Sequence, residues 1–211
     1  MDSFYNEVND WLLVGGDLLI AEHLTGMDEL ETIAHLIGEG VTHVIDARSE
    51  WTDLTAWIAG GMPTANYCYA PIIDQWDHQP PEDWYVKVET FVRNFLENRS
   101  EGDRLYVHCH MGVNRGPSAA MLALLTADPS LSPWDAFLAI REARTIAGVV
   151  YAEYVGLRHL VRANLGDDDA LYRDLGEFRD RMEDYWNPER IGQVNRGIAY
   201  YRGKERSTLV M

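Results

Sequence analysis

The sequence is poor in cysteine and in basic residues, and it lacks any long apolar run. Only two cysteines occur among 211 residues, which excludes the disulfide framework typical of small secreted proteins. No run of 18 apolar residues is present, so the sequence predicts no membrane-spanning helix. The first residues, MDSFYNEVNDW, are acidic and polar and do not resemble a secretory signal. We therefore expect a cytoplasmic protein.

Basic residues are scarce relative to acidic ones. Lys and Arg number 18 against 34 Asp and Glu, and the net charge is −16. A surface of this sign repels nucleic-acid backbones and anionic lipid headgroups. We therefore expect neither nucleic acid nor membrane among the partners. In this background, an arginine inside a pocket is a candidate anion ligand.

What the chain does contain is an alternation of strand-like and helix-like segments. Strands are predicted within 11–21, 41–47, 66–73 and 104–109, and helices within 27–40, 82–98, 116–127, 132–143 and 149–165. Segment 11–21 is expected to form two short strands around a Gly-Gly turn. Alternating strands and helices are typical of an α/β fold with a three-layer, mainly parallel central sheet flanked by helices.

The pattern changes after Gly166. Two amphipathic helices are predicted in residues 167–211, separated by Asn187-Pro188. We predict one domain over residues 1–166 and a C-terminal helical hairpin extension over 167–211. The extension either packs on the first domain or serves association, such as formation of a homodimer.

The most informative stretch is VHCHMGVNRGPSAA, residues 107–120. A loop between a strand end and a helix N-terminus directs backbone N–H groups and the helix dipole at one point, which suits an anion. Gly112 permits a tight curve, and Arg115 can bind two oxygens of a phosphate with its planar fork. Cys109 at the base of this loop would be stabilised as a thiolate and set up for in-line attack on phosphorus.

The neighbouring positions are candidate substrate-binding residues. They are His110, Met111, Gly112, Val113, Asn114 and Gly116. His108 is expected to orient the loop through hydrogen bonds rather than to transfer a proton. Two other interpretations of the stretch stay open. One is a buried structural cysteine, and the other is a rhodanese-like sulfur carrier, which would favour a shorter loop.

The pattern His108-Cys109-x-x-Gly112-x-x-Arg115 resembles the signature of the cysteine-dependent protein tyrosine phosphatase superfamily, in its dual-specificity branch. The likeness spans roughly residues 8–160 and includes VGGDLLIA, GVTHVIDARSEW, NYCYAPIIDQWDHQPP and AIREAR. It implies a protein tyrosine phosphatase-like fold, a catalytic domain over 1–166, a phosphocysteine intermediate and no metal or other cofactor. The implied substrate is a phosphoprotein, with phosphotyrosine, phosphoserine or phosphothreonine, or a small aryl phosphate.

The resemblance also implies a general acid for the leaving oxygen. Asp74 and Asp77 both lie in the loop DQWDHQPP (74–81). The Asp-x-x-Pro-Pro order after Asp77 resembles the acid loop of some members, and Asp77 stands 32 residues before Cys109. Asp74 stands 35 residues before it and fits the pattern of other members. We favour Asp77, with Asp74 as the alternative.

Gly116 departs from the family pattern, which has Ser or Thr directly after the arginine. That hydroxyl donates to the cysteine sulfur and eases breakdown of the phosphoenzyme. Ser118, two residues later, is expected to point elsewhere on a regular helix. The departure leaves open an alternative function, a phosphate-binding pseudophosphatase with little turnover.

Several other side chains have two interpretations each. Arg48 either meets a substrate phosphate or lies on the surface, and Arg144 is expected to pair with a nearby carboxylate. Cys68 is either a core residue or a trap that forms a disulfide with oxidised Cys109. The aromatic residues near the acid loop either stack on an aryl ring or pack the loop, and they are Trp76, Trp84 and Tyr85.

Overall fold

The computed structural model describes residues 3–75 and 78–208. Within them lies a five-stranded sheet in the order β1-β2-β5-β3-β4. The strands are β1 Tyr5–Glu7, β2 Leu12–Gly15, β3 Val41–Asp46, β4 Tyr67–Tyr69 and β5 Arg104–His108. β1 pairs antiparallel with β2, and the other pairs are parallel. The predicted mainly parallel sheet is confirmed.

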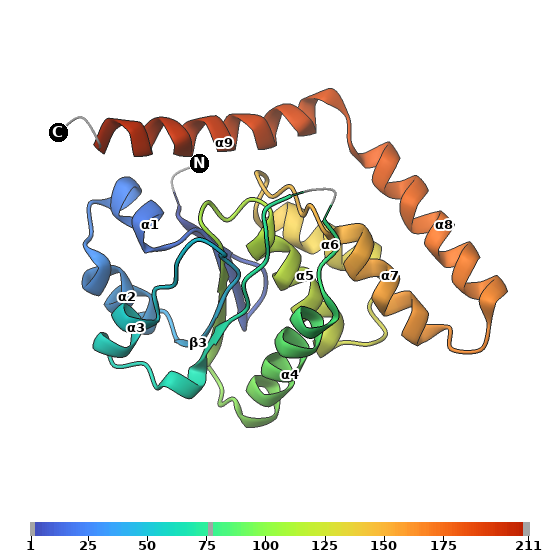
Figure 1. Cartoon of the computed structure of the whole chain (residues 1–211), viewed down its shortest axis with the longest axis horizontal. Helices are drawn as coiled ribbons and strands as arrows, with labels where there is room; N and C mark the ends of the chain where they lie inside the picture. Colours follow the sequence, from blue (N-terminus) through green and yellow to red (C-terminus); the bar gives the residue numbers. More distant parts are fainter. Residues whose placement is uncertain (1–2, 76–77, 209–211) are drawn as a thin grey trace.

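Helices cover both faces of the sheet (Figure 1). One face carries α1 Leu18–Thr25, α2 Glu29–Gly38 and α3 Leu54–Ala59, and the other carries α4 Glu82–Asn98, α5 Arg115–Ala127, α6 Pro133–Ala143 and α7 Ala152–Ala163. β5 serves both cores, because side chains alternate along a strand. Leu105 and Val107 pack under α4–α7, whereas Tyr106 packs under α1–α3. The predicted three-layer arrangement is confirmed.

One predicted element was wrong. Segment 11–21 was expected to contain two strands, but β2 ends at Gly15 and α1 begins at Leu18. Asp17 is the reason, because its Oδ1 accepts a hydrogen bond from Ile20 N at 3.0 Å and so caps the helix. Three short elements, β1, α3 and the 3-10 helix Thr64–Asn66, were not predicted.

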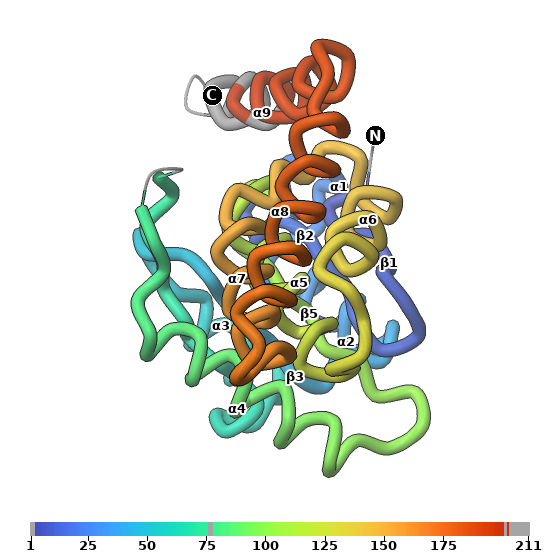
Figure 2. The backbone as a smooth tube through the Cα atoms, turned by 90° about the vertical axis from the view of Figure 1, so that its right-hand side faces the viewer, coloured from blue at the N-terminus to red at the C-terminus, as the bar shows by residue number. Residues whose placement is uncertain are grey.

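The C-terminal segment forms α8 Asp168–Tyr185 and α9 Pro188–Thr208. The hairpin prediction was wrong, because α8 runs along α6 and α7 whereas α9 turns away across the end of the body towards α1 (Figures 1 and 2). Each helix has its own apolar partner on the body. Phe178 of α8 packs into the core under α7, and Gly197 of α9 lies against Ile146. Association through this segment stays a prediction.

No helix among residues 3–75 and 78–208 is both long enough and apolar enough to cross a membrane.

Candidate active site

The predicted strand-to-helix junction lies at the carboxyl end of the central strand. Cys109 directly follows β5, and Arg115 is the first residue of α5. Both side chains are buried. β5 runs parallel to β2 and β3 on either side, and open parallel sheets bind ligands at the carboxyl ends of their strands. Residues 109–115 are called the signature loop below.

Arg144 holds two successive carbonyl groups of the signature loop. Its Nε donates to the Gly112 carbonyl at 2.7 Å, and its Nη2 donates to the Met111 carbonyl at 3.1 Å. Its Nη1 donates to Asn6 Oδ1 at 2.7 Å, which ties the loop to the N-terminal segment. We predicted an ion pair with a nearby carboxylate for Arg144. We did not predict that Arg144 fixes the loop through neutral oxygen atoms.

Two more loop carbonyls are held by backbone amides. The His110 carbonyl accepts from Asp17 N at 2.9 Å, and the Val113 carbonyl accepts from Gly148 N at 2.7 Å. In a planar trans peptide, the N–H of the next residue points away from the carbonyl. Because the carbonyls of residues 110–113 all face these outer partners, the N–H groups of residues 111–114 face the opposite side. Such a row of amides is what an anion-binding loop requires.

Gly112 is required at its position. Its φ is +65°, and a Cβ there would lie 2.4–2.8 Å from backbone atoms of Gly15 and Gly16. Glycine adopts this left-handed conformation without a steric cost and leaves room for the close approach. Gly112 therefore lets the signature loop pack against the turn that follows β2.

The Arg115 guanidinium faces two carboxylates. Its Nη1 lies 2.6 Å from Glu50 Oε2, and its Nε lies 3.7 Å from Asp74 Oδ2. Within the described residues, Arg115 Nε makes no hydrogen bond. Burial alone would lower the pKa of Arg115, but the charge of Cys109 and the two carboxylates raise it. Arg115 is thus a buried, charged donor beside Cys109, with Glu50 occupying one of its nitrogens.

Of the two candidate acids, Asp74 lies beside the signature loop. Its Oδ1 accepts from Asn114 Nδ2 at 3.1 Å, and its side chain is partly exposed. Asp77, the acid that we favour, lies outside the described residues, as does Trp76. The preference for Asp77 over Asp74 therefore stays a prediction.

The comparison with known sequences gives one curated relative. No family model matches the chain. A dual specificity protein phosphatase 12 of Mus musculus is 29% identical over 123 residues, which is 58% of this chain and 31% of that protein. The chain therefore spans about a third of the length of this relative, and the aligned part is similar in sequence to a dual-specificity phosphatase.

Solved structures share the fold. The Cydia pomonella PTP-2 phosphatase matches with a TM-score of 0.57 and 16% identity, covering 74% of this chain and 89% of that one. Human DUSP28 matches with a TM-score of 0.51 and 14% identity, covering 87% and 97%. PTPMT1, solved in complex with PI(5)P, matches with a TM-score of 0.53 and 17% identity, covering 85% and 99%.

This chain has the protein tyrosine phosphatase fold. The predicted resemblance to the cysteine-dependent protein tyrosine phosphatase superfamily, in its dual-specificity branch, is confirmed by the sequence match and by the fold. Activity, reaction mechanism and substrate are proposals, made below.

A buried ion cluster supports the signature loop through His110, and here the prediction for Arg48 was wrong. Arg48 is fully buried and does not reach the surface. It binds Asp46 at 2.7 Å, Asp17 at 2.8 Å and Asp53 at 2.8 Å. Asp17 Oδ2 also lies 2.8 Å from His110 Nδ1, so the cluster reaches the loop through His110. Three carboxylates offset the cost of burying this guanidinium.

His108 was predicted to orient the loop through hydrogen bonds, and this prediction was wrong. Within the described residues, neither of its ring nitrogens has a hydrogen-bond partner. Its ring stacks on Tyr106, with centroids 5.3 Å apart and an interplanar angle of 16°. Burial lowers the pKa of His108 despite the opposing charge of Asp46. His108 is therefore a neutral packing residue directly before Cys109.

The aromatic residue at the site is one that the sequence did not single out. Trp84 and Tyr85 are buried in the core, and Trp84 Nε1 donates to the Ala70 carbonyl at 3.1 Å. Trp84 and Tyr85 therefore have a packing role, which is one of the two interpretations given above, and do not stack on a substrate ring. Trp51 is exposed, and its ring lies edge-on to His110 with centroids 5.3 Å apart. It follows β3, whose carboxyl end adjoins the signature loop, and this adjacency was the available signal.

Gly116 allows α5 to pack directly on the backbone of His108 and Cys109. Its φ is not positive, and a Cβ there would lie 3.0 Å from Cys109 N and from His108 C. The Ser118 hydroxyl donates to the Asn114 carbonyl at 2.8 Å and accepts from Tyr151 N at 3.2 Å. Ser118 therefore does not supply the hydroxyl that is missing at position 116. This agrees with the prediction that Ser118 points elsewhere on a regular helix.

Cys68 is a core residue and not a disulfide trap. It lies on β4 opposite Ile45 of β3, and Ile45 lies opposite Val107 of β5. β4 and β5 are thus separated by β3, which places them roughly 9–10 Å apart. A disulfide needs Cα atoms within roughly 7 Å. Burial also raises the pKa of Cys68 to about 11, which disfavours its reactive thiolate form.

Proposed function

We propose that this chain hydrolyses phosphate monoesters through a phosphocysteine intermediate on Cys109. The observation that carries the proposal is the signature loop. A buried cysteine and a buried arginine bracket four peptide planes whose carbonyls are held outward. A phosphate would accept hydrogen bonds from the inward amides and from Arg115. The sequence similarity to a dual-specificity phosphatase supports the same reaction.

In the first step, the Cys109 thiolate attacks phosphorus in line with the leaving oxygen. The P–S bond forms as the P–O bond breaks, and Asp77, or alternatively Asp74, donates a proton to the leaving oxygen. The amides of the loop and Arg115 stabilise charge on the remaining phosphoryl oxygens. In the second step, water attacks phosphorus, the same carboxylate accepts its proton, and the Cys109 thiolate leaves.

The proposed substrate is an aryl phosphate, either free or as phosphotyrosine in a protein. The exposed Trp51 ring beside His110 supports this choice, because an aryl leaving group can pack against it. The dual-specificity resemblance extends the proposal to phosphoserine and phosphothreonine. Both cysteines are free, and we propose a cytoplasmic setting, in which thiols stay reduced.

The test is hydrolysis of p-nitrophenyl phosphate with and without orthovanadate, which mimics the transition state of phosphoryl transfer. The native chain is expected to release nitrophenol and to be inhibited by vanadate. Cys109→Ser is expected to lose turnover but to retain phosphate binding. Cys68→Ser is the matched control, since it also removes one buried thiol, and it should remain active. Full activity in Cys109→Ser would refute the proposal.

A second candidate is a phosphate-binding pseudophosphatase with little turnover. Gly116 favours it, since the nearby Ser118 hydroxyl is already engaged by Asn114 and Tyr151. This candidate predicts vanadate or phosphate binding that depends on Arg115, without multiple turnovers. Steady-state turnover of p-nitrophenyl phosphate distinguishes it from the first candidate.

A further inference from the structure

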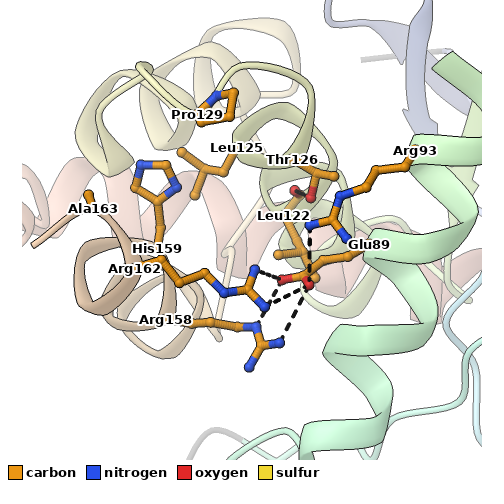
Figure 3. Close-up of a pocket in the computed structure, with 10 residues that line it drawn as sticks. All are labelled: Glu89, Arg93, Leu122, Leu125, Thr126, Pro129, Arg158, His159, Arg162 and Ala163. Atoms are coloured by element: carbon orange, nitrogen blue, oxygen red, sulfur yellow. Dashed lines mark hydrogen bonds and ion pairs between the residues drawn. The ribbon is translucent and has the colours of Figure 1, made fainter. Parts of the chain in front are cut away.

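An arginine-rich pocket lies between α4, α5 and α7 (Figure 3). Its volume is about 220 Å³, and its walls carry three arginines, one glutamate and several apolar side chains. Arg115 begins α5, whereas Thr126 in the last turn of α5 lines this pocket. Eleven residues of helix separate them by roughly 16 Å. The pocket is therefore distinct from the signature loop.

Glu89 lies at the centre of the arginines (Figure 3). Its Oε1 accepts from Arg158 Nε at 2.8 Å and from Arg162 Nη1 at 2.6 Å, and its Oε2 accepts from Arg162 Nη2 at 3.0 Å. Burial alone would raise the pKa of Glu89, but Arg158 and Arg162 lower it. Glu89 is thus an ionised, buried carboxylate whose hydrogen bonds come from two of the three arginines.

The three arginines carry more charge than the two glutamates that they contact. Arg158 is shared with Glu82, which its Nη1 reaches at 2.7 Å. Arg93 Nη2 lies 3.8 Å from Glu89 Oε2, and the Arg93 and Arg162 side chains are 54% and 47% exposed. Three arginines against Glu82 and Glu89 leave a net charge of +1 in this cluster, whereas the charge of Asp128 acts on His159 of the pocket wall. The C-terminal dipole of α5 contributes roughly −0.5 charge, which does not cancel it.

The other wall is apolar. Leu122, Leu125, Pro129 and Ala163 line it. His159 also lines the pocket, and burial and the charge of Arg162 lower its pKa against the opposing charge of Asp128, so it adds no charge near neutral pH. A ligand that fits must combine a negative group with a compact apolar body. A positive arginine cluster in a pocket is also unusual on a chain whose net charge is −16.

We propose that this pocket binds a small organic anion. Its carboxylate or phosphate group contacts Arg93 and Arg162, and its apolar body packs against Leu122 and Leu125. Arg158 stays with Glu82 and Glu89 and supports the pocket wall. This site is independent of the proposed hydrolysis and of Cys109.

The test is isothermal titration calorimetry with phenylphosphonate and with benzoate on the full-length Arg115→Ala chain, in which the signature loop has lost its main anion ligand. At least one probe is expected to bind saturably at one site, and the better probe identifies the head group. Arg93→Gln with Arg162→Gln should weaken that binding at least tenfold. Absence of binding by both probes would overturn the proposal, as would binding that the double substitution leaves unchanged.

The matched control is Arg173→Gln with Arg179→Gln. This control also removes two positive charges, but from exposed arginines of α8. Each of these arginines pairs with one carboxylate, and binding should stay unchanged. Glu89→Gln serves if the arginine variants do not fold. It removes the competing carboxylate and keeps all three arginines, so it should tighten binding severalfold. Weaker or unchanged binding in Glu89→Gln would contradict the site.

Discussion

The Arg115 guanidinium and the Glu50 carboxylate form an ion pair across the signature loop, with Nη1 2.6 Å from Oε2. Burial alone would raise the pKa of Glu50, but its hydrogen bond and charge pairing with Arg115 lower it. Glu50 is therefore ionised at neutral pH and occupies a nitrogen that a phosphate would use. A substrate must displace this carboxylate or share Arg115 with it.

Glu50→Gln is expected to lower the KM for p-nitrophenyl phosphate by about 2–5-fold. The Glu50 side chain is 42% exposed, and ion pairs open to solvent contribute roughly 0.2–1 kcal/mol, which corresponds to a factor of up to about five. Steady-state kinetics check this. A loss of kcat with unchanged KM would show instead that Glu50 positions Arg115 for the reaction.

The two candidate acids differ in the expected dependence on the leaving group. Asp77→Asn should lower kcat for alkyl phosphates by on the order of 10²–10⁴, the range for losing a general acid, and should affect p-nitrophenyl phosphate much less. Asp74→Asn breaks a contact with Asn114 and should act mainly on KM. If Asp74→Asn alone shows the leaving-group dependence, Asp74 is the acid and the preference for Asp77 is wrong.

The glycine after Arg115 predicts a slow second step. A hydrogen bond to a charged group contributes roughly 1.5–3 kcal/mol. Its loss from the leaving thiolate would slow phosphoenzyme hydrolysis by about 10–10². Rapid-quench kinetics with p-nitrophenyl phosphate should therefore show a burst of nitrophenol followed by slow turnover.

The hydroxyl can be tested by comparing Gly116→Ser with Gly116→Ala. Both substitutions introduce the same Cβ, which would lie 3.0 Å from Cys109 N, so any strain in the loop is common to both. Gly116→Ser should exceed Gly116→Ala in steady-state kcat and show a smaller burst. Equal kcat in the two variants would show that the hydroxyl does not serve the sulfur here.

Arg48→Met should destabilise the fold without touching the substrate site. It leaves the carboxylates of Asp17, Asp46 and Asp53 without their shared cation, and breaking a buried pair costs roughly 3–5 kcal/mol. Urea unfolding measures this. Arg173→Met, at an exposed position, is the control and should change the free energy of unfolding by less than about 0.5 kcal/mol. Equal stability of the two variants would contradict the role of the cluster.

The same cluster gives a pH dependence. Burial alone would raise the pKa of Asp46, but the hydrogen bonds and charge of Arg48 and the hydrogen bond from Tyr67 lower it. A carboxyl whose folded pKa is lowered stabilises the fold above its unfolded pKa, and this contribution disappears as pH falls through the folded pKa. The stability difference between the native chain and Arg48→Met should therefore shrink below roughly pH 4.

Local sequence signals predicted the signature loop and much of the fold. Helix 82–98 was predicted with the bounds that α4 has, because two prolines and two acidic residues mark its start. The Cys109–Arg115 spacing located the loop between β5 and α5. Segment 11–21 failed because its apolar run suits a strand or a helix, and the capping role of Asp17 was not recognised.

Contacts between distant segments could not be read from the sequence. Glu50 and Arg115 are 65 residues apart, and no local pattern pairs them. Arg48 was expected to meet a phosphate or solvent, because a buried arginine is rare unless it is paired. Its three partners come from positions 17, 46 and 53, and only the sheet and the turn after β2 bring them together.

The most direct test of the central claim is to trap the phosphoenzyme. The native chain is mixed with p-nitrophenyl phosphate, quenched in acid during the burst, and examined by mass spectrometry of the intact chain and its peptides. We predict one phosphoryl group on Cys109, which accumulates during the burst and persists through the slow steady state until the substrate is exhausted, and none in Cys109→Ser. Nitrophenol release without a phosphoryl group on Cys109, or with one on another residue, would contradict the account.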